Sequence, residues 1–359
     1  MASPQSNTRD EPTVRDLLTG RKLPRRAPLI AAAAGTGLSL LLAALGLVDG
    51  LVGIAVVAAI LFATIQSGWS LAVEGRRHAI DRLATTAVYA TFVLAAAPLI
   101  SVLTTVIVKG LPVINATFLT HSMRNVDPQE PGGGLQHAIV GTFQQVGIAT
   151  LIGVPLGVLA AIYLVEYSVD ARSRRLSRSI EFVVDVMTGV PSIIIGLFVY
   201  SAFILTLGLP RSGFAAAIAL AILMIPVVVR STQEMLRIVP RDLREASLAL
   251  GIPRWRTITK IVLPTALAGI ITGAMLAIAR IAGETAPLLL TTFLSQSFNY
   301  NAFKGPQSAL PTFIWDQFTS GTQASQDRAW GGALVLITIV MLFYAGARLV
   351  ARFAGIKKS

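Results

Sequence analysis

The sequence predicts an all-α polytopic membrane protein with about eight transmembrane helices and with both termini in the cytoplasm. Three observations indicate this class. First, 54% of the 359 residues are hydrophobic and only 13% are charged, with a mean hydropathy of +0.69, a balance that soluble domains do not have. Second, the apolar runs reach the roughly 20 residues that a helix needs to cross a bilayer. Third, the basic residues cluster between alternate apolar runs, which is typical of membrane topology and not of a nucleic-acid-binding surface.

The apolar runs give eight expected spans. They cover residues 28–48, 51–73, 84–108, 141–166, 181–207, 212–230, 265–291 and 330–352. With the N-terminus placed in the cytoplasm, 24 of the 30 lysines and arginines lie in cytoplasmic segments, five lie outside, and Arg280 lies within a span. This asymmetry predicts the orientation, because cytoplasmic loops carry the excess of basic residues.

The expected spans divide the chain into three parts. Residues 1–27 are predicted to be a polar cytoplasmic tail, and 28–83 an accessory transmembrane hairpin that ends in a basic connector. Residues 84–359 are expected to form a six-span core, with a cytoplasmic segment at 231–264. The accessory part is expected to regulate, stabilise or bind something, and the sequence leaves these alternatives open.

Two long segments, about 110–140 and 292–329, fall on the outer side. They are either surfaces for a partner outside the membrane or solvated connectors. The chain has no cysteine, so it has neither disulfides nor thiolate metal ligands. Its three histidines are scattered and do not predict a metal site.

The cytoplasmic stretch from Glu245 to Pro264 has the pattern of two short helices joined at a glycine. Residues 241–250 carry apolar side chains at helical spacing, and Gly251 can end that helix in the left-handed conformation. A second short helix is expected over 254–263, before Pro264 passes the chain to the next span.

This stretch resembles the "EAA" loop of ABC-importer permeases. The matching positions are Glu245, Ala246, Gly251, Ile261, Leu263 and Pro264, whereas Ser247 replaces the second alanine of the pattern. The resemblance implies that Glu245, Ala246, Ser247, Gly251, Leu263 and Pro264 couple the chain to a separate ATPase subunit. The alternative is a connector that packs on its own protein.

The seventh span contains a charged pair, Arg280 and Glu284. Arg280 lies about 15 residues from the cytoplasmic end of the span, or roughly 22 Å, where a charge is costly and usually faces the bundle interior or a watery cavity. One reading is an anion site, because arginine presents a planar fork that matches oxyanions and stays charged. The other is a structural pair within one helix, although that order of charges is the weaker one.

The fifth span is expected to break at Gly189-Val190-Pro191-Ser192, because proline removes a backbone hydrogen bond. Broken helices in transporters turn backbone N–H groups toward anionic substrates, and the hydroxyls of Thr188 and Ser192 can add donors. The alternative is a kink that only shapes the bundle, with both hydroxyls bonded back to their own helix.

The stretch Arg280 to Leu289, with Gly283, Glu284 and Thr285 at its centre, resembles the signature of the PstA-type membrane subunit of bacterial phosphate ABC importers. The related PstC-type subunit shares the arginine and Gly-Glu-Thr but typically departs after the threonine. Further similar stretches begin at His137, Tyr163 and Gly189, so the resemblance covers about 137–350. It implies that Arg280, Glu284, Thr285, Thr188 and Ser192 line the substrate pathway.

The resemblance implies a non-catalytic permease subunit of a bacterial inner-membrane phosphate importer with a type I core. Its expected partners are a PstC-type permease subunit, an ATPase dimer, an extracytoplasmic phosphate-binding protein and the lipid bilayer. The chain is expected to hold no cofactor, because it lacks a GxxxxGK[ST] stretch and ATP with its Mg²⁺ belongs to the ATPase. Alternatives are a permease for sulfate or molybdate and a secondary transporter that needs no ATPase.

Overall fold

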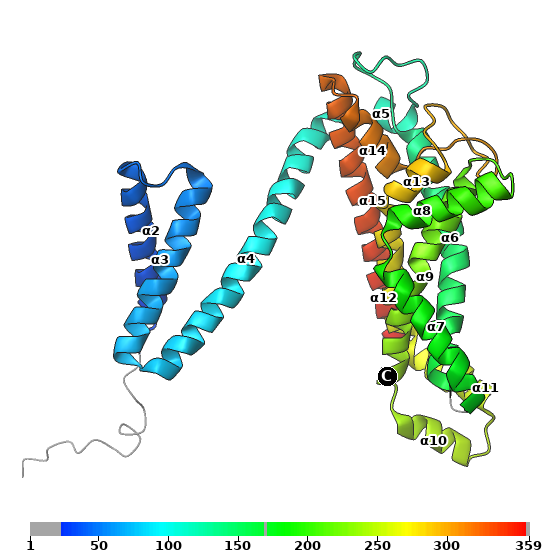
Figure 1. The fold of residues 1–359 in the computed structure, drawn as a ribbon, viewed down its shortest axis with the longest axis horizontal. Coiled ribbons are helices and arrows are strands. Elements are labelled where there is room, and N and C mark those ends of the chain that lie inside the picture. The colour runs from blue at the N-terminus through cyan, green and yellow to red at the C-terminus, as the bar shows by residue number, and fades with distance from the viewer. Residues whose placement is uncertain (1–22, 169–170, 357–359) are drawn as a thin grey trace, which may run out of the picture. The chain divides into compact units, whose positions relative to one another are not determined.

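The computed structural model describes residues 23–168 and 171–356, and the regular structure of this part is helical (Figure 1). Seven of its helices are long and apolar enough to cross a membrane, or eight if one bent pair counts as a single span. The predicted all-α class is therefore confirmed, while the orientation of the termini and the division at residue 83 stay predictions. The chain forms two compact units, Met1–Leu103 and Thr104–Ser359. The predicted polar tail lies outside the described residues up to position 22.

The first unit contains α2 (Ala27–Ala44), α3 (Gly50–Val73) and the beginning of α4 (Arg76–Gly110). The helices α2 and α3 pack as a hairpin, and their backbones approach closely at Gly35. A Cβ atom at Gly35 would lie 2.9 Å from the backbone nitrogen of Phe62. Ser39 strengthens the contact, since its hydroxyl donates to the carbonyl of Ile54 at 2.6 Å.

A buried carboxylate fixes the turn from α3 to α4. Glu74 accepts two hydrogen bonds from the Arg82 guanidinium, at 2.7 and 2.9 Å, one from the Ser70 hydroxyl at 2.8 Å and one from the backbone N–H of Leu23 at 2.7 Å. Its side chain is 3% exposed. The Arg82 hydrogen bonds, with those from Leu23 and Ser70, lower the pKa of Glu74 to about 2 against the effect of burial. The corner therefore carries an ionised carboxylate at neutral pH.

The second unit is built around α9 (Gly213–Ile238), most of whose residues are buried. It packs against α6 (Gln136–Ile162) and α12 (Leu263–Ala282), and α12 in turn packs against α15 (Gln323–Ile356). Small residues permit the closest approach, because a Cβ atom at Gly157 would lie 2.8 Å from the Val228 side chain. The bundle core is therefore held by tight packing of apolar and small side chains.

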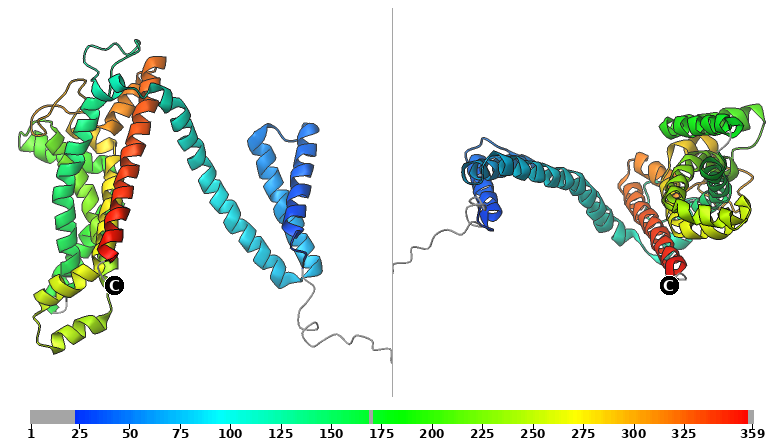
Figure 2. Two further views of the ribbon diagram at one scale, coloured as in Figure 1. Left: turned by 180° about the vertical axis from the view of Figure 1, so that it is seen from behind. Right: turned by 90° about the horizontal axis from the view of Figure 1, so that it is seen from below.

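Short elements gather at the two ends of this unit (Figures 1 and 2). At one end lie α10 (Arg241–Ala249) and α11 (Arg254–Thr257). At the opposite end lie α5 (Ala116–Thr120), which follows a 3₁₀ turn at Leu111–Val113, and α14 (Leu310–Thr319). The bundle thus separates the predicted coupling segment from the two long segments that were placed on the outer side.

The expected break in the fifth span is present. Residues 173–189 of α7 (Ala171–Gly189) and the segment Ser192–Thr206, made of α8 (Ser192–Val199) and a π-helical segment (Tyr200–Thr206), meet at 108°. Pro191 has a ψ of 138°, far from the roughly −42° of an α-helix, so the α-helix is interrupted there and the chain turns. The stretch 181–207 is therefore two helical segments, and the number of spans in the described part of the chain is eight if the bent pair is one broken span and seven if it is not.

Two expectations about the seventh span are wrong. Helix α12 does not begin after Pro264, because residues Arg254–Ala282 form one continuous helical segment. A π-helical turn at Ile258–Val262 precedes the proline, and its i→i+5 bonding relieves the clash that proline makes in a regular helix. The same helix ends at Ala282, with Gly283 at its C-cap, and a separate helix, α13 (Ala286–Thr291), follows. A single span over 265–291 does not form.

Candidate functional site: a coupling elbow and a broken helix pair

The elbow between α10 and α11 has the predicted glycine turn. Gly251 has a φ of +73°, a conformation that side chains disfavour. The N–H of Gly251 donates to the Leu248 carbonyl at 2.9 Å, and the N–H of Ile252 donates to the Ser247 carbonyl at 3.2 Å. This pair of bonds is a Schellman motif, which satisfies the last carbonyls of α10 and sets the angle of the elbow.

Ser247, the one departure from the motif, has a structural role. Its side chain is buried, and its hydroxyl lies 2.8 Å from the hydroxyl of Thr257 on α11. The two halves of the elbow are therefore bonded to each other as well as joined by the chain. By contrast, Glu245, Ala246 and Gly251 are exposed.

An ion pair ties the elbow to the bundle. The Nη2 atom of Arg244 lies 2.7 Å from Glu166 Oε1, and Glu166 belongs to the π-helical turn Tyr163–Tyr167 that ends α6. The same guanidinium donates to the carbonyls of Leu236 at 2.8 Å and Val239 at 2.7 Å, at the end of α9. One side chain thus joins α10 to the ends of two core helices. We call this contact, made by Arg244 with Glu166 and the two carbonyls, the elbow pin.

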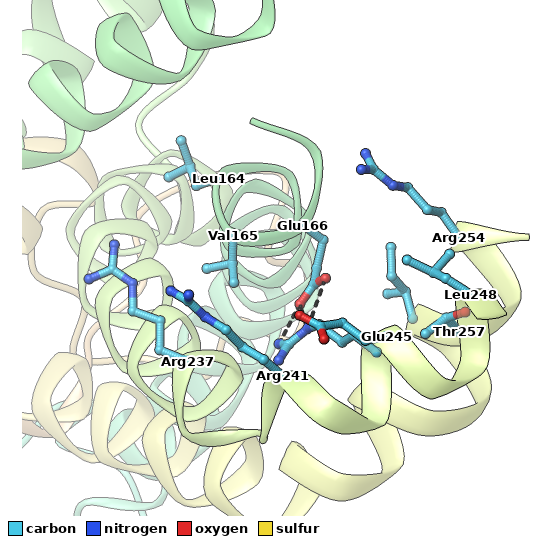
Figure 3. Close-up of a pocket in the computed structure, with 11 residues that line it drawn as sticks. Leu164, Val165, Glu166, Arg237, Arg241, Glu245, Leu248, Arg254 and Thr257 are labelled. Atoms are coloured by element: carbon cyan, nitrogen blue, oxygen red, sulfur yellow. Dashed lines mark hydrogen bonds and ion pairs between the residues drawn. The ribbon is translucent and has the colours of Figure 1, made fainter. Parts of the chain in front are cut away.

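Arg244 and Glu166, the ion pair of the elbow pin, also line an open pocket of about 610 Å³ (Figure 3). Arg237 and Arg241 lie on one side of Glu166, and Arg254 lies on the other. None of these three arginines has an ion-pair partner within residues 23–168 and 171–356. Glu166 is neutralised by Arg244, and Glu245 is the other acid that lines the pocket, so the three remaining arginines leave the pocket with a net positive charge.

Exposed apolar side chains accompany this basic pocket. Leu250 is 80% exposed, and Leu243, Leu248 and Trp255 are 43%, 44% and 55% exposed. All four lie in the elbow and not in the expected lipid-facing part of a span. An apolar patch beside a charged pocket is typical of a protein-docking surface.

Arg280 lies near the end of α12, two residues before the break. Its side chain is exposed, and it has no ion-pair partner in the described part of the chain. The alternative of a structural pair with Glu284 in one helix is not realised, because the helix has ended before Glu284. The N–H of Glu284 donates to the carbonyl of Ile281 at 3.2 Å, within the turn that ends α12.

The two breaks meet in the bundle. α8 packs against α13, and a Cβ atom at Gly196 would lie 2.6 Å from the Cα atom of Pro287. Only glycine permits this approach, so the start of the segment after Pro191 is held against the segment after Gly283. The sequence predicted one break and placed the other inside a continuous span, but it gave no sign that they are neighbours.

The predicted hydroxyl donors differ in their bonding. Thr188 donates to the carbonyl of Val184 at 2.8 Å, so its hydroxyl is bonded back to its own helix, as the alternative reading expected. Ser192 and Thr285 are partly exposed, and no side-chain hydrogen bond of either is found among the described residues. Ser192 and Thr285 therefore keep a donor available at the two breaks.

Buried polar residues join the bundle to the long outer segments. Gln145 is buried in α6 and donates to the Gln307 carbonyl at 3.3 Å, while the Gln307 amide bonds to Gln144 at 2.5 Å. Arg328, also buried, donates to the carbonyls of Pro128 and Glu130 at 3.0 and 2.7 Å. These contacts hold the long outer segments to the bundle, because Gln307 lies in the second segment while Gln144 and Gln145 lie in α6. Likewise, Pro128 and Glu130 lie in the first segment while Arg328 lies in α15.

Arg211 is a further basic residue that the sequence identified only by its place outside. Its guanidinium carbon lies 4.9 Å from the ring centroid of Phe293 and 5.1 Å from that of Tyr200. Phe293 has a φ of +66°, which is unusual for a bulky residue. Within the described residues, no three acidic or histidine side chains gather where they could hold a metal ion.

An apolar helical bundle with an unpaired arginine next to a helix break, and with exposed apolar side chains on an elbow at one end, is typical of a membrane transport subunit. Residues 153–354 match the family described as "Binding-protein-dependent transport system inner membrane component". The chain belongs to this family, and it is a multi-pass membrane protein.

Curated relatives agree with this assignment. The chain is 45% identical over 284 residues to the phosphate transport system permease protein PstA 1 of Mycobacterium tuberculosis (strain CDC 1551 / Oshkosh), which covers 79% of this chain and 92% of the relative. It is 43% identical over 245 residues to PstA of Xylella fastidiosa (strain Temecula1), covering 68% of this chain and 83% of the relative. The resemblance to PstA-type permeases is thus confirmed. A solved inward-facing form of the MetNI methionine ABC transporter is 20% identical, covers 62% of this chain and 94% of its own, and has a TM-score of 0.48.

Proposed function

We propose that the chain is the PstA-type permease subunit of an ATP-driven importer that moves inorganic phosphate across the bacterial inner membrane into the cytoplasm. The observation that carries the proposal is Arg280, an exposed and unpaired arginine near the end of an apolar helix. The extent of the match to named PstA proteins supports phosphate as the cargo.

Arg280 is proposed to meet the anion at the two helix breaks. An arginine fork binds two phosphate oxygens at once and stays charged at every physiological pH. The hydroxyls of Ser192 and Thr285 supply uncharged donors at those breaks, and Glu284 opposes the anion so that binding stays weak enough for release. Thr188 acts only when its hydroxyl leaves the carbonyl of Val184.

The elbow is proposed to dock on a separate ATPase dimer and to move with it when the dimer binds and hydrolyses ATP. The exposed Glu245, Ala246 and Gly251 and the surrounding leucines form the docking face, and the basic pocket favours an acidic partner. Leu263 and Pro264 belong to the helix that continues into the bundle. The chain itself is proposed to perform no catalysis and to hold no cofactor.

The continuous helix Arg254–Ala282 explains how the elbow can act on the anion site. Arg280 lies 26 residues after Arg254, or about 39 Å along one helix. A rigid helix moves as a body, so displacement of α11 displaces Arg280, and the elbow pin makes α10 follow the ends of α6 and α9. Movement of the elbow therefore opens the substrate pathway alternately to the two sides of the membrane. A PstC-type subunit forms the other half of this pathway. An extracytoplasmic phosphate-binding protein delivers the anion.

The test is transport by the reconstituted complex. The chain is co-purified with its PstC-type permease, ATPase and binding protein and placed in proteoliposomes, and uptake of labelled phosphate is measured with and without ATP. Uptake that requires ATP and resists excess sulfate is expected. Uptake of sulfate or molybdate instead of phosphate would refute the assigned cargo, and phosphate uptake without ATP would indicate a secondary transporter.

A further inference from the structure

The first unit contains an apolar groove of about 770 Å³ between its hairpin and the beginning of α4. Its walls come from all three helices of the unit. Gln66, Arg82, Ala63, Ile60 and Val93 are among the residues that line it. The groove belongs to residues up to Leu103 and involves no residue of the permease bundle.

The groove is polar at one end and apolar at the other. Gln66 lies seven residues before the end of α3, and Arg82 lies six residues after the start of α4, so both are about 10 Å from the turn that joins these helices. Ile60 and Val93 lie farther along the same helices. From Arg82 to Val93 the groove follows α4 for about 16 Å, close to half of a hydrocarbon core about 30 Å thick. Its length matches one leaflet.

Gln66 has a buried, unpaired acceptor that indicates a ligand in the groove. Its side chain is only 7% exposed, and its Oε1 atom is buried without a hydrogen-bond partner in the part of the chain that the structure describes. A buried acceptor of this kind costs stability unless a donor reaches it. Because Gln66 lines the groove, a ligand in the groove can supply that donor.

The polar end is also basic. The guanidinium of Arg82 is fixed by Glu74, and its side chain stays 29% exposed. Arg76 and Arg77 follow the turn and are exposed, as are Arg25 and Arg26 before α2. Asp81 is the exposed acid nearest to these residues in the chain. The net charge at this end is therefore positive.

We propose that this groove binds one anionic phospholipid whose headgroup carries hydroxyl donors, as that of phosphatidylglycerol does. The phosphate lies at Arg82, a headgroup hydroxyl donates to Gln66 at the same depth, and an acyl chain follows the wall from Ala63 to Val93. Arg76 and Arg77, which precede the groove at the start of α4, attract the anionic headgroup from outside it. An apolar groove alone accepts any membrane lipid. The basic rim and the unpaired amide oxygen are what select an anionic one. The inference does not depend on the cargo proposed for the permease.

Lipid binding by the purified full-length chain tests the proposal. Native mass spectrometry measures the binding of palmitoyl-oleoyl phosphatidylglycerol and of phosphatidylcholine with the same acyl chains. At roughly 1 kcal/mol per basic residue, replacing both surface arginines in Arg76→Gln/Arg77→Gln should weaken phosphatidylglycerol binding by more than tenfold and leave phosphatidylcholine unchanged. The matched control Arg124→Gln, an exposed arginine of the other unit, should change neither lipid.

A second pair of variants tests the groove itself. Ala63→Trp fills the groove and should abolish phosphatidylglycerol binding. Ala95→Trp is the control and should leave the binding unchanged, because Ala95 is an exposed residue of α4 that does not line the groove. Equal affinity for the two lipids, or full phosphatidylglycerol binding by Ala63→Trp, would overturn the proposal. Because the chain has no cysteine, Ala63→Cys in native membranes gives a unique thiol. Its crosslinking to another protein would show that a helix occupies the groove, which would also overturn it.

Discussion

Breaking the elbow pin is predicted to loosen α10 from the bundle. In Arg244→Gln the ion pair with Glu166 and the bonds to the carbonyls of Leu236 and Val239 are lost together. The two side chains of the pair are 19% and 9% exposed, so the pair is nearly buried. Removing one partner of a buried pair costs about 3–5 kcal/mol, and an exposed pair contributes roughly 0–1 kcal/mol. For this geometry we expect a loss of about 3 kcal/mol, near the lower end of the buried range.

The assay combines thermal unfolding of the purified chain with the mobility of a spin label on the elbow. Leu250→Cys, 80% exposed, supplies the only thiol for the label. Arg244→Gln should lower the unfolding midpoint by about 2–4 °C per kcal/mol and should make the label more mobile. Arg241→Gln is the matched control, because Arg241 lies on the same helix and has no ion-pair partner among the described residues.

A double-mutant cycle separates the pair from the rest of the pin. Glu166→Gln should be destabilising alone and should add little in the Arg244→Gln background, because their shared contact is already lost. If Arg244→Gln behaves like Arg241→Gln in both stability and label mobility, the elbow is not held by this residue and the reasoning is wrong.

Three further predictions concern packing, hydrogen bonding and pH. Gly196→Ala places a Cβ atom against Pro287 and should lower stability by about 1–3 kcal/mol, measured by thermal unfolding; unchanged stability would show that the two breaks do not pack closely. Ser247→Ala restores the alanine of the family motif but leaves the Thr257 hydroxyl buried without its partner, so it should lower the stability by about 1 kcal/mol. Adding Thr257→Val removes that hydroxyl and should restore the stability. Unchanged stability of Ser247→Ala alone would contradict this. The low pKa of Glu74, about 2, means that its ionised form stabilises the corner above pH 4.5 and that this contribution is lost as the pH falls from 4.5 toward 2. The unmodified chain should therefore be more stable than Glu74→Gln at neutral pH, and the difference in stability should shrink in acid. A difference that grows in acid would contradict the prediction.

The sequence predicted those features that depend on local chemistry. Gly251 ends α10 in the left-handed conformation because no side chain tolerates it easily, and Pro191 breaks its span because it cannot continue a helix. The motif around Glu245 and the signature around Arg280 identified the family before any fold was considered. These features are carried by a few residues at fixed spacing, so one sequence is enough.

The sequence did not predict those features that depend on contacts between distant segments. Nothing local indicated that Arg244 reaches Glu166, 78 positions away, although an acid and a base expected on the same membrane face were a usable signal. Pro264 was expected to separate two helices, but a π-helical turn before it lets the helix continue. Ser247 is explained only by Thr257 lying opposite. Such contacts follow from tertiary packing, which overrides local preference.

Arg280 is proposed to contact phosphate during ATP-driven import. The most direct measurement is labelled phosphate uptake by cells that lack their own phosphate transporters and express the complete complex, with Arg280→Gln compared at matched membrane abundance. Arg280→Lys is included because it keeps the charge without the fork. Uptake should collapse in Arg280→Gln and be partly retained in Arg280→Lys, while the purified complex still hydrolyses ATP. Normal phosphate uptake by Arg280→Gln would contradict the account and return Arg280 to a structural role.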